Sequence, residues 1–126
     1  MSSSLLLDSH ALLWWETDDE RLTESAREAV EQADATLFFS AASIWELAIK
    51  RAQGKLTLPA TFLATLAAEG FAELSVSSAH ALDAAALPLL HRDPFDRMLV
   101  AQARSERLTL VTNDAHIAAY DVPVLW

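Results

Sequence analysis

Four acidic side chains stand where a parallel β-sheet would collect them. Asp8 ends a short apolar run that is typical of a buried strand, and Asp114 lies three residues beyond Val111, just past another such run. Glu46 and Asp96 fall in the first turns of two predicted helices. Ligands of open α/β sheets bind at the carboxyl ends of the strands. The spacing therefore predicts that these four carboxylates meet in one cleft.

Carboxylates gathered in this way repel one another. At 4 Å and an effective dielectric constant near 20, each like-charged pair costs on the order of 4 kcal/mol. Either some of the acids stay protonated or a metal ion lies among them. The chain has no cysteine, and oxygen ligands suit Mg²⁺ or Mn²⁺ better than zinc. We therefore predict that Asp8, Glu46, Asp96 and Asp114 are metal ligands and catalytic groups.

Each acid also has a purely structural interpretation. Asp8 could cap the helix that follows it, and Asp114 could be a turn residue. Glu46 lies three residues after Ser43, as in a capping box, and four residues before Lys50, as in a helical ion pair. Capping does not require every acid to fall at the same edge of the sheet, so their shared position favours a common site.

The stretch HRDPFDRM, residues 91–98, contains two aspartates with different expected roles. Asp93 precedes Pro94, which predicts an N-cap followed by proline in the first helical position. Asp96 would then lie at the positive end of the helix dipole, where an anionic ligand is stabilised. We expect Asp96 to bind metal and Asp93 to position it. His91 neighbours these acids, and none of the four histidines has zinc-site spacing.

Composition indicates one compact domain covering residues 1–126, with 52% hydrophobic and 21% charged residues. The net charge of −9 has the wrong sign for binding nucleic acid through phosphate neutralisation alone, so any nucleic-acid-binding function would need an added cation. No apolar run approaches the roughly 20 residues that cross a bilayer. The N-terminus lacks the basic segment of a signal peptide, and a cytoplasmic location is expected.

Apolar patterning predicts an α/β fold with three layers and a central, mostly parallel sheet of about five strands. The expected strands cover residues 4–8, 36–40, 71–76, 108–112 and 122–126. The expected helices cover residues 22–33, 41–54, 60–70 after Pro59, 78–90, 94–107 and a short segment within 113–120. Trp14 and Trp15 are adjacent and cannot both face one core, so one of them is expected to be half exposed at a boundary or partner surface.

Four stretches together resemble the PIN domain, specifically the VapC toxins of bacterial toxin–antitoxin pairs. They are LLLDSHALLW, SAASIWELAIK, DPFDRMLVAQA and LVTND, in the family's order. The resemblance implies a PIN-like fold, a Mg²⁺-dependent ribonuclease acting on RNA, a homodimer, and inhibition by a VapB-type antitoxin. It also implies that Asp8, Glu46 and Asp96 are the core acids, with Asp114 as a fourth. Asn113 stands where an arginine or another polar residue is common.

Further residues are expected to support this site. The predicted second shell comprises Ser9, Ser43, Asp93 and Thr112. The side chains predicted to hold the RNA backbone are Arg51, Lys55, Arg92 and Arg97, although arginines on helices are usually just solvated.

Three other functions are open on the sequence alone. A haloacid-dehalogenase-like phosphatase would place a second aspartate two residues after Asp8, where this chain has His10. A response-regulator receiver would need a late lysine, and the last lysine here is Lys55. A catalytically silent PIN-like interaction module would keep the acids for stability, and stabilisation by Mg²⁺ or Mn²⁺ would argue against it.

Overall fold

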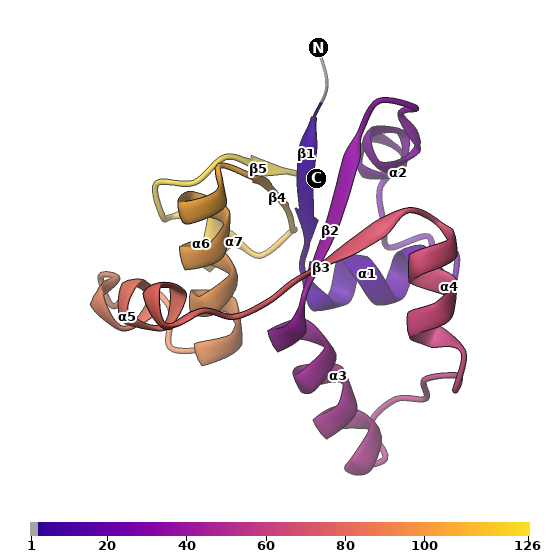
Figure 1. Ribbon diagram of the computed structural model, residues 1–126, viewed down its shortest axis with the longest axis horizontal. Coiled ribbons are helices and arrows are strands. Elements are labelled where there is room, and N and C mark those ends of the chain that lie inside the picture. Colours follow the sequence, from indigo (N-terminus) through magenta and orange to yellow (C-terminus); the bar gives the residue numbers. More distant parts are fainter. Residues whose placement is uncertain (1–2) are drawn as a thin grey trace.

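Five parallel strands form the centre of the computed structural model, which describes residues 3–126 (Figure 1). They are β1 (Ser4–Leu7), β2 (Thr36–Ser40), β3 (Phe71–Leu74), β4 (Thr109–Val111) and β5 (Val124–Leu125). Their order in the sheet is β3-β2-β1-β4-β5, and every neighbouring pair is parallel. The predicted five-stranded parallel sheet is confirmed. Residues 1 and 2 of the domain predicted over residues 1–126 lie outside the described part of the chain.

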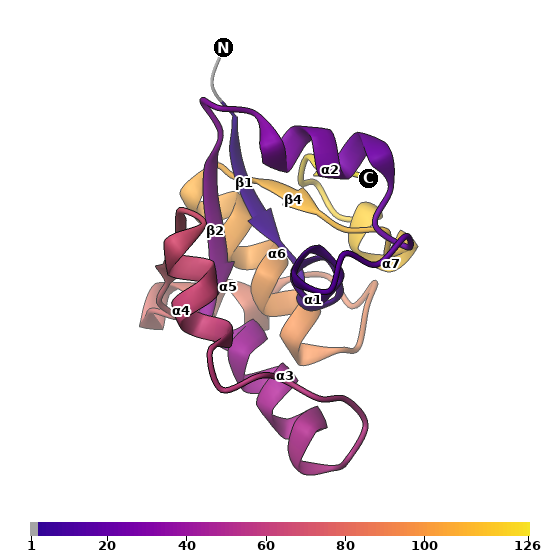
Figure 2. The ribbon, with the colours of Figure 1, turned by 90° about the vertical axis from the view of Figure 1, so that its right-hand side faces the viewer.

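Helices cover both faces of this sheet, as predicted for a three-layer fold (Figures 1 and 2). They are α1 (Ser9–Glu16), α2 (Glu24–Glu31), α3 (Ala41–Ala52), α4 (Phe62–Ala68), α5 (Ser78–Ala86), α6 (Pro94–Glu106) and α7 (Ala115–Ala118). Leu5 and Leu7 of β1 belong to the core beneath α1, α2 and α4, whereas Leu6 packs with Leu99 of α6 on the other face. Successive strand residues point to opposite faces, so one apolar run serves both cores.

No helix within residues 3–126 combines the length and the apolar character needed to cross a membrane.

The start of α3 differs from the predicted capping box. Ser40, the last residue of β2, is the N-cap, and its hydroxyl accepts a hydrogen bond from the Ala42 backbone N–H at 3.0 Å. The strand runs directly into the helix, so Ser43 already lies inside the first turn. Glu46 therefore stands in the second turn and makes no cap. The capping-box interpretation of Ser43 and Glu46 was wrong, which leaves the Glu46 carboxylate free for other contacts.

The start of α6 agrees with the prediction, whereas that of α4 differs from it. Asp93 is the N-cap of α6, with its carboxylate accepting from the backbone N–H groups of Phe95 and Asp96 at 2.8 and 3.2 Å, and Pro94 follows as predicted. The helix predicted at residues 60–70 is shorter, because α4 begins at Phe62 rather than directly after Pro59. Gly70, with φ +89°, follows its end in the left-handed conformation that glycine adopts without strain.

Arg97 of α6 fastens the segment that joins α5 to α6. Its guanidinium donates hydrogen bonds of 2.9–3.3 Å to the carbonyls of Ala84, Leu87, Pro88 and His91 and to the Tyr120 hydroxyl. The same hydroxyl accepts from the backbone N–H of His91 and donates to the Pro88 carbonyl. Sequence reasoning assigned Arg97 to the RNA backbone. In the structure its donors are already used within the protein.

Replacement of Arg97 by alanine should destabilise the fold. The change leaves half-buried carbonyls of the α5–α6 connection without their charged donor, so we expect the free energy of unfolding to fall by about 2–3 kcal/mol. Urea denaturation measures this value. The matched control is Arg92→Ala, since Arg92 is exposed in the same connection and should change stability by less than about 0.5 kcal/mol. Equal effects of the two substitutions would contradict this role of Arg97.

Candidate metal centre

The four predicted acids come together at the carboxyl edge of the sheet. Asp8, Glu46, Asp96 and Asp114 all line one cleft of about 430 Å³. Asp8 follows β1, Glu46 projects from α3, Asp96 from the first turn of α6, and Asp114 precedes α7. The expected convergence is therefore present, and it brings side chains from residues 8 to 114 within one concavity.

Asp8 has both of the roles that the sequence left open. It is the N-cap of α1, accepting a hydrogen bond from the Ala11 backbone N–H at 2.8 Å, and it also lines the cleft. Its side chain is buried, and burial raises the pKa of this carboxyl despite a hydrogen bond from Thr112. The Thr112 hydroxyl also accepts from the backbone N–H of Asp114 at 3.1 Å. Thr112 thus bonds to the carboxyl group of Asp8 and to the backbone of Asp114.

Glu46 is held from two sides. The Ser9 hydroxyl donates a short hydrogen bond to Oε1 of Glu46, and Nζ of Lys50 lies 3.3 Å from Oε2. The helical ion pair with Lys50 is therefore present. Ser43, the other serine predicted to support the acids, is buried, yet its hydroxyl has no hydrogen-bond partner among residues 3–126. Of the two serines, only Ser9 is bonded to a carboxylate.

His91 bridges the remaining two acids. Its Nε2 atom lies 2.8 Å from Oδ2 of Asp96 and 3.3 Å from Oδ2 of Asp114. The imidazole also stacks on His116, with ring centroids 5.0 Å apart. From the sequence, His91 was noted only because it is near Asp93 and Asp96 in the chain. Its contact with Asp114 could not be predicted, because folding alone brings these two residues together. The bonds from Tyr120 and Arg97 hold its backbone in place.

The two acids around His91 differ in protonation. Burial and the nearby charge of Asp93 raise the pKa of Asp96 to about 7, although the hydrogen bond with His91 opposes the shift. Burial alone would raise the pKa of Asp114, but the backbone N–H of His116 and the charge of His91 together hold that pKa below its usual value. Near neutral pH, Asp114 is therefore ionised, whereas Asp96 still exchanges its proton.

The donors in this cleft fit a divalent cation. One oxygen each from Asp96 and Asp114 and Nε2 of His91 all lie within 4.8 Å of one another. Adjacent ligands of an octahedral ion with bonds of about 2.1 Å are roughly 3 Å apart, close to the observed 2.8 and 3.3 Å. Asp8 and Glu46 add two carboxylates to the same cleft. Because carboxylate oxygens make up most of this donor set, it suits Mg²⁺ or Mn²⁺.

The predicted RNA-binding cations lie elsewhere. Arg51, Lys55 and Arg92 are exposed, and they are not among the described residues that line the acidic cleft. The cation that does line it is Lys50, which sequence reasoning treated only as the ion-pair partner of Glu46. The helical spacing of Glu46 and Lys50 was the signal that could have placed both at the site.

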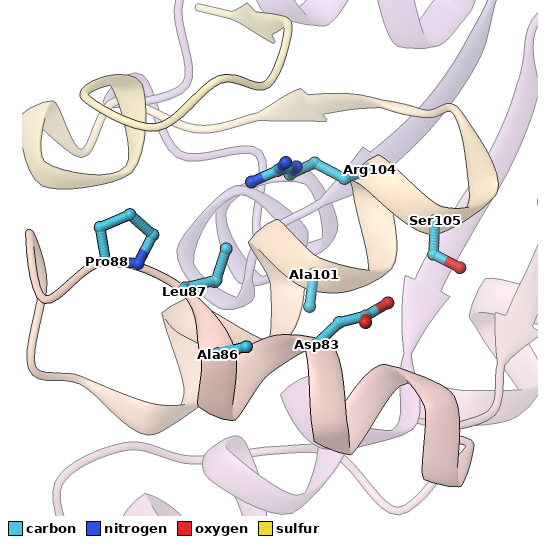
Figure 3. A pocket seen from close by; sticks show the side chains of 7 residues that line it. All are labelled: Asp83, Ala86, Leu87, Pro88, Ala101, Arg104 and Ser105. Carbon is cyan, nitrogen blue, oxygen red and sulfur yellow. The ribbon is translucent and has the colours of Figure 1, made fainter.

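A larger hollow of about 550 Å³ lies between α5 and α6, away from these acids. Figure 3 shows Asp83 and Arg104 at this hollow, with Leu87, Pro88 and two alanines completing much of the wall. Among residues 3–126, those that line this hollow include a single carboxylate, that of Asp83, and no histidine. Size therefore does not identify the site, whereas the gathered carboxylates and His91 do.

The two serines provide a test of how the acids are supported. Ser9→Ala removes the hydroxyl that holds Glu46, and loss of such an outer partner lowers metal affinity by about 10- to 100-fold in comparable sites. Ser43→Ala is the matched control, since the Ser43 hydroxyl has no partner to lose. Titration of each protein with Mn²⁺ by calorimetry should show weaker binding for Ser9→Ala alone. Equal affinities would contradict the assigned support.

The raised pKa of Asp96 should make stability depend on pH in metal-free protein. Between pH 3.8, the ordinary pKa of an aspartate, and about pH 7, folded Asp96 keeps a proton that the unfolded chain has released. The free energy of unfolding should therefore fall as pH rises through this range, and the raised pKa of Asp8 acts in the same direction. Thermal denaturation with chelator at pH 5 and pH 8 should show a smaller difference for Asp96→Asn than for the wild type. An unchanged difference would refute the shift at Asp96.

Sequence comparison places these residues in a known family. The family model of the PIN domain matches residues 5–123. Ribonuclease VapC22 of Mycobacterium tuberculosis is 34% identical over 124 residues, which cover 96% of this chain and 95% of that protein.

Solved structures agree on the fold. VapBC2 from Rickettsia felis, bound to a DNA fragment from its promoter, has a TM-score of 0.72 at 15% identity, covering 97% of both chains. A toxin–antitoxin complex from Klebsiella pneumoniae has a TM-score of 0.68 at 19% identity, covering 97% of this chain and 96% of that one. With the acids gathered as the sequence predicts and with this similarity over nearly its whole length, the chain belongs to the PIN-domain family and, within it, to the VapC group.

Proposed function

We propose that this chain is a Mg²⁺-dependent endoribonuclease, the toxin of a VapBC-type pair, and that it hydrolyses RNA phosphodiester bonds. The observation that carries the proposal is the cleft in which Asp8, Glu46, Asp96 and Asp114 meet around the Nε2 atom of His91. The 34% identity to Ribonuclease VapC22 supports the same reaction class. Mn²⁺ is a plausible substitute for Mg²⁺ with this set of donors.

The residues that would hold the ion are Asp96 and Asp114 with His91, joined by Glu46 and Asp8, which line the same cleft. The chemistry that a bound divalent cation supplies is Lewis-acid stabilisation of the phosphodiester charge and a lower pKa for a nearby water. Asp93 holds the first turn of α6 and therefore the direction of Asp96. Ser9 and Lys50 hold Glu46, so the protein keeps its carboxylates oriented before substrate arrives.

A general base is also available in the cleft. Asp8 is buried and burial raises the pKa of its carboxyl, which brings a carboxylate closer to the pKa that suits proton transfer at neutral pH. In this proposal Asp8 accepts the proton of the attacking water on a carboxylate oxygen that is not bound to the ion, while Thr112 and the backbone N–H of Ala11 fix its orientation.

RNA binding must overcome the acidic character of the chain. The net charge is −9, so the cation and Lys50 in the cleft are proposed to offset the phosphate at the reaction centre. Arg51, Lys55 and Arg92 remain the proposed contacts for the RNA backbone farther out, since all three are exposed. Arg97 is left out of this group because its guanidinium is bonded within the protein.

We further propose that a VapB-type antitoxin inhibits the chain, that the chain forms a homodimer, and that it acts in the cytoplasm on tRNA or rRNA. The structural relatives support the first point, because they include VapBC complexes from Rickettsia felis and Salmonella typhimurium. The rival proposal is a catalytically silent PIN-like module, which would share the fold without cleaving RNA.

Incubation of purified, antitoxin-free protein with tRNA and rRNA, with Mg²⁺ or with chelator, tests this function. We expect cleavage that requires Mg²⁺ and that falls by more than about 100-fold in Asp8→Asn and Asp96→Asn, since loss of a direct ligand should exceed the effect of an outer partner. Asparagine can still cap α1, so Asp8→Asn should remain folded.

The matched control is Asp83→Asn, an acid on α5 that lines the distant hollow and should keep full activity. If the folded wild type shows neither Mg²⁺-dependent cleavage nor stabilisation by Mg²⁺ or Mn²⁺, the silent module is the better description. Full activity of Asp8→Asn or Asp96→Asn would contradict the proposed roles of these acids.

A further inference from the structure

The acidic cleft has an aromatic wall that the proposed chemistry does not use. His10 and Trp14, one turn apart on α1, line the same cleft as the four acids. Their rings are stacked, with centroids 5.4 Å apart and planes inclined by 19°. Trp14 is half-buried, whereas His10 is exposed. The imidazole therefore has one face on Trp14 and remains accessible from the cleft.

Trp14 is itself held firmly. The ring of Trp126, at the C-terminal end of the sheet, packs edge-on against it with centroids 5.8 Å apart and planes inclined by 62°. The guanidinium of Arg21 lies 4.7 Å from the centre of the Trp14 ring. These contacts tie α1 to two other parts of the chain and provide His10 with a rigid backing. A preorganised surface loses little side-chain freedom when a ligand stacks on it.

We propose that His10, backed by Trp14, binds one unpaired nucleobase of the RNA beside the phosphate that is cleaved. This inference rests on the proposed ribonuclease function and adds a requirement for the substrate: a nucleotide next to the cleaved bond must be free to leave its own stack. Proteins commonly recognise single-stranded RNA by stacking its bases on aromatic side chains, including histidine.

The charge around His10 selects a base over a phosphate. His10 stands two residues after Asp8 and shares the cleft with all four acids. A phosphate group placed on this wall would face those carboxylates directly, whereas a base is neutral and presents a π-face. Stacking of this kind tolerates any base. The contact with His10 would therefore require an unpaired nucleotide but would not depend on which base it carries.

Metal binding is a poorer role for His10. Among the described residues, the cleft already offers the four predicted carboxylates and the imidazole of His91 to an ion, so it does not need His10 as a ligand. The stacking contact with Trp14 also orients the ring, and the other face of the imidazole is the aromatic surface that the structure offers to a base.

Steady-state cleavage of a short single-stranded RNA containing a mapped cleavage site tests the proposal. His10→Ala should lower kcat/KM by about 5- to 100-fold, the range expected for loss of one base–aromatic stack, mainly through KM. His10→Phe keeps an aromatic face and should stay within a few-fold of wild type. His10 is exposed, and equal thermal stability of the three proteins would exclude a folding effect.

A second set of substrates separates base stacking from a general effect of the substitution. Each nucleotide flanking the cleaved bond is replaced in turn by an abasic one. At one position the loss should lower kcat/KM for the wild type and for His10→Phe, but should add little for His10→Ala, because the contact is already absent.

The inference is overturned if His10→Ala cleaves the intact RNA like the wild type, or if every abasic substitution affects wild type and His10→Ala equally. It is also overturned if His10→Ala binds a cognate antitoxin more weakly while cleaving RNA normally, since the wall would then serve a protein. Wild-type protein that cleaves no RNA would instead remove the proposed function, and this inference would fall with it.

Discussion

The mutual repulsion of four carboxylates at one edge of a parallel sheet is the constraint on which the other features of this protein depend. Each acid is provided with donors from a different part of the chain: Asp8 from the Ala11 backbone, Glu46 from Ser9 and Lys50, Asp96 from His91, and Asp114 from the His116 backbone. Even so, burial and, to a lesser degree, the charges of neighbouring acids raise the pKa of Asp8 and Asp96. Internal donors thus relieve the repulsion only in part, which leaves the cleft suited to a divalent cation.

An apolar core on both faces of the sheet fixes the position of the strand that carries Asp8. Leu5, Leu6 and Leu7 of β1 are almost fully buried between two helical layers, so the strand that carries Asp8 cannot shift without exposing both cores. The opposite wall depends on polar contacts instead. Arg97 and Tyr120 bind the backbone of the α5–α6 connection, and that connection presents His91 to Asp96 and Asp114. Apolar packing therefore positions Asp8, whereas hydrogen bonds position His91.

The distribution of charge also limits how RNA can approach. With a net charge of −9, long-range attraction to the phosphate backbone is weak or unfavourable, and contacts inside the cleft must contribute more. Lys50 and a bound cation would act on the phosphate, while the stacked rings of His10 and Trp14 offer a neutral contact for a base. The acidic wall and the aromatic wall therefore suit different parts of one nucleotide.

Local patterns in the sequence determined the positions of the strands, the edge of the sheet at which the acids meet, and the start of α6 at Asp93 and Pro94. These features could be predicted because strand patterning and helix capping depend on residues within a few positions of one another. The tertiary structure alone decided which neighbours those acids have. His91 reaches Asp114 across 23 residues of chain, Ser9 rather than Ser43 bonds Glu46, and Arg97 turns to backbone carbonyls instead of solvent. Such contacts depend on the path of the loops and on which side of a helix faces the core. Two side chains of the same type, with similar local sequence, can therefore have different environments in the folded protein.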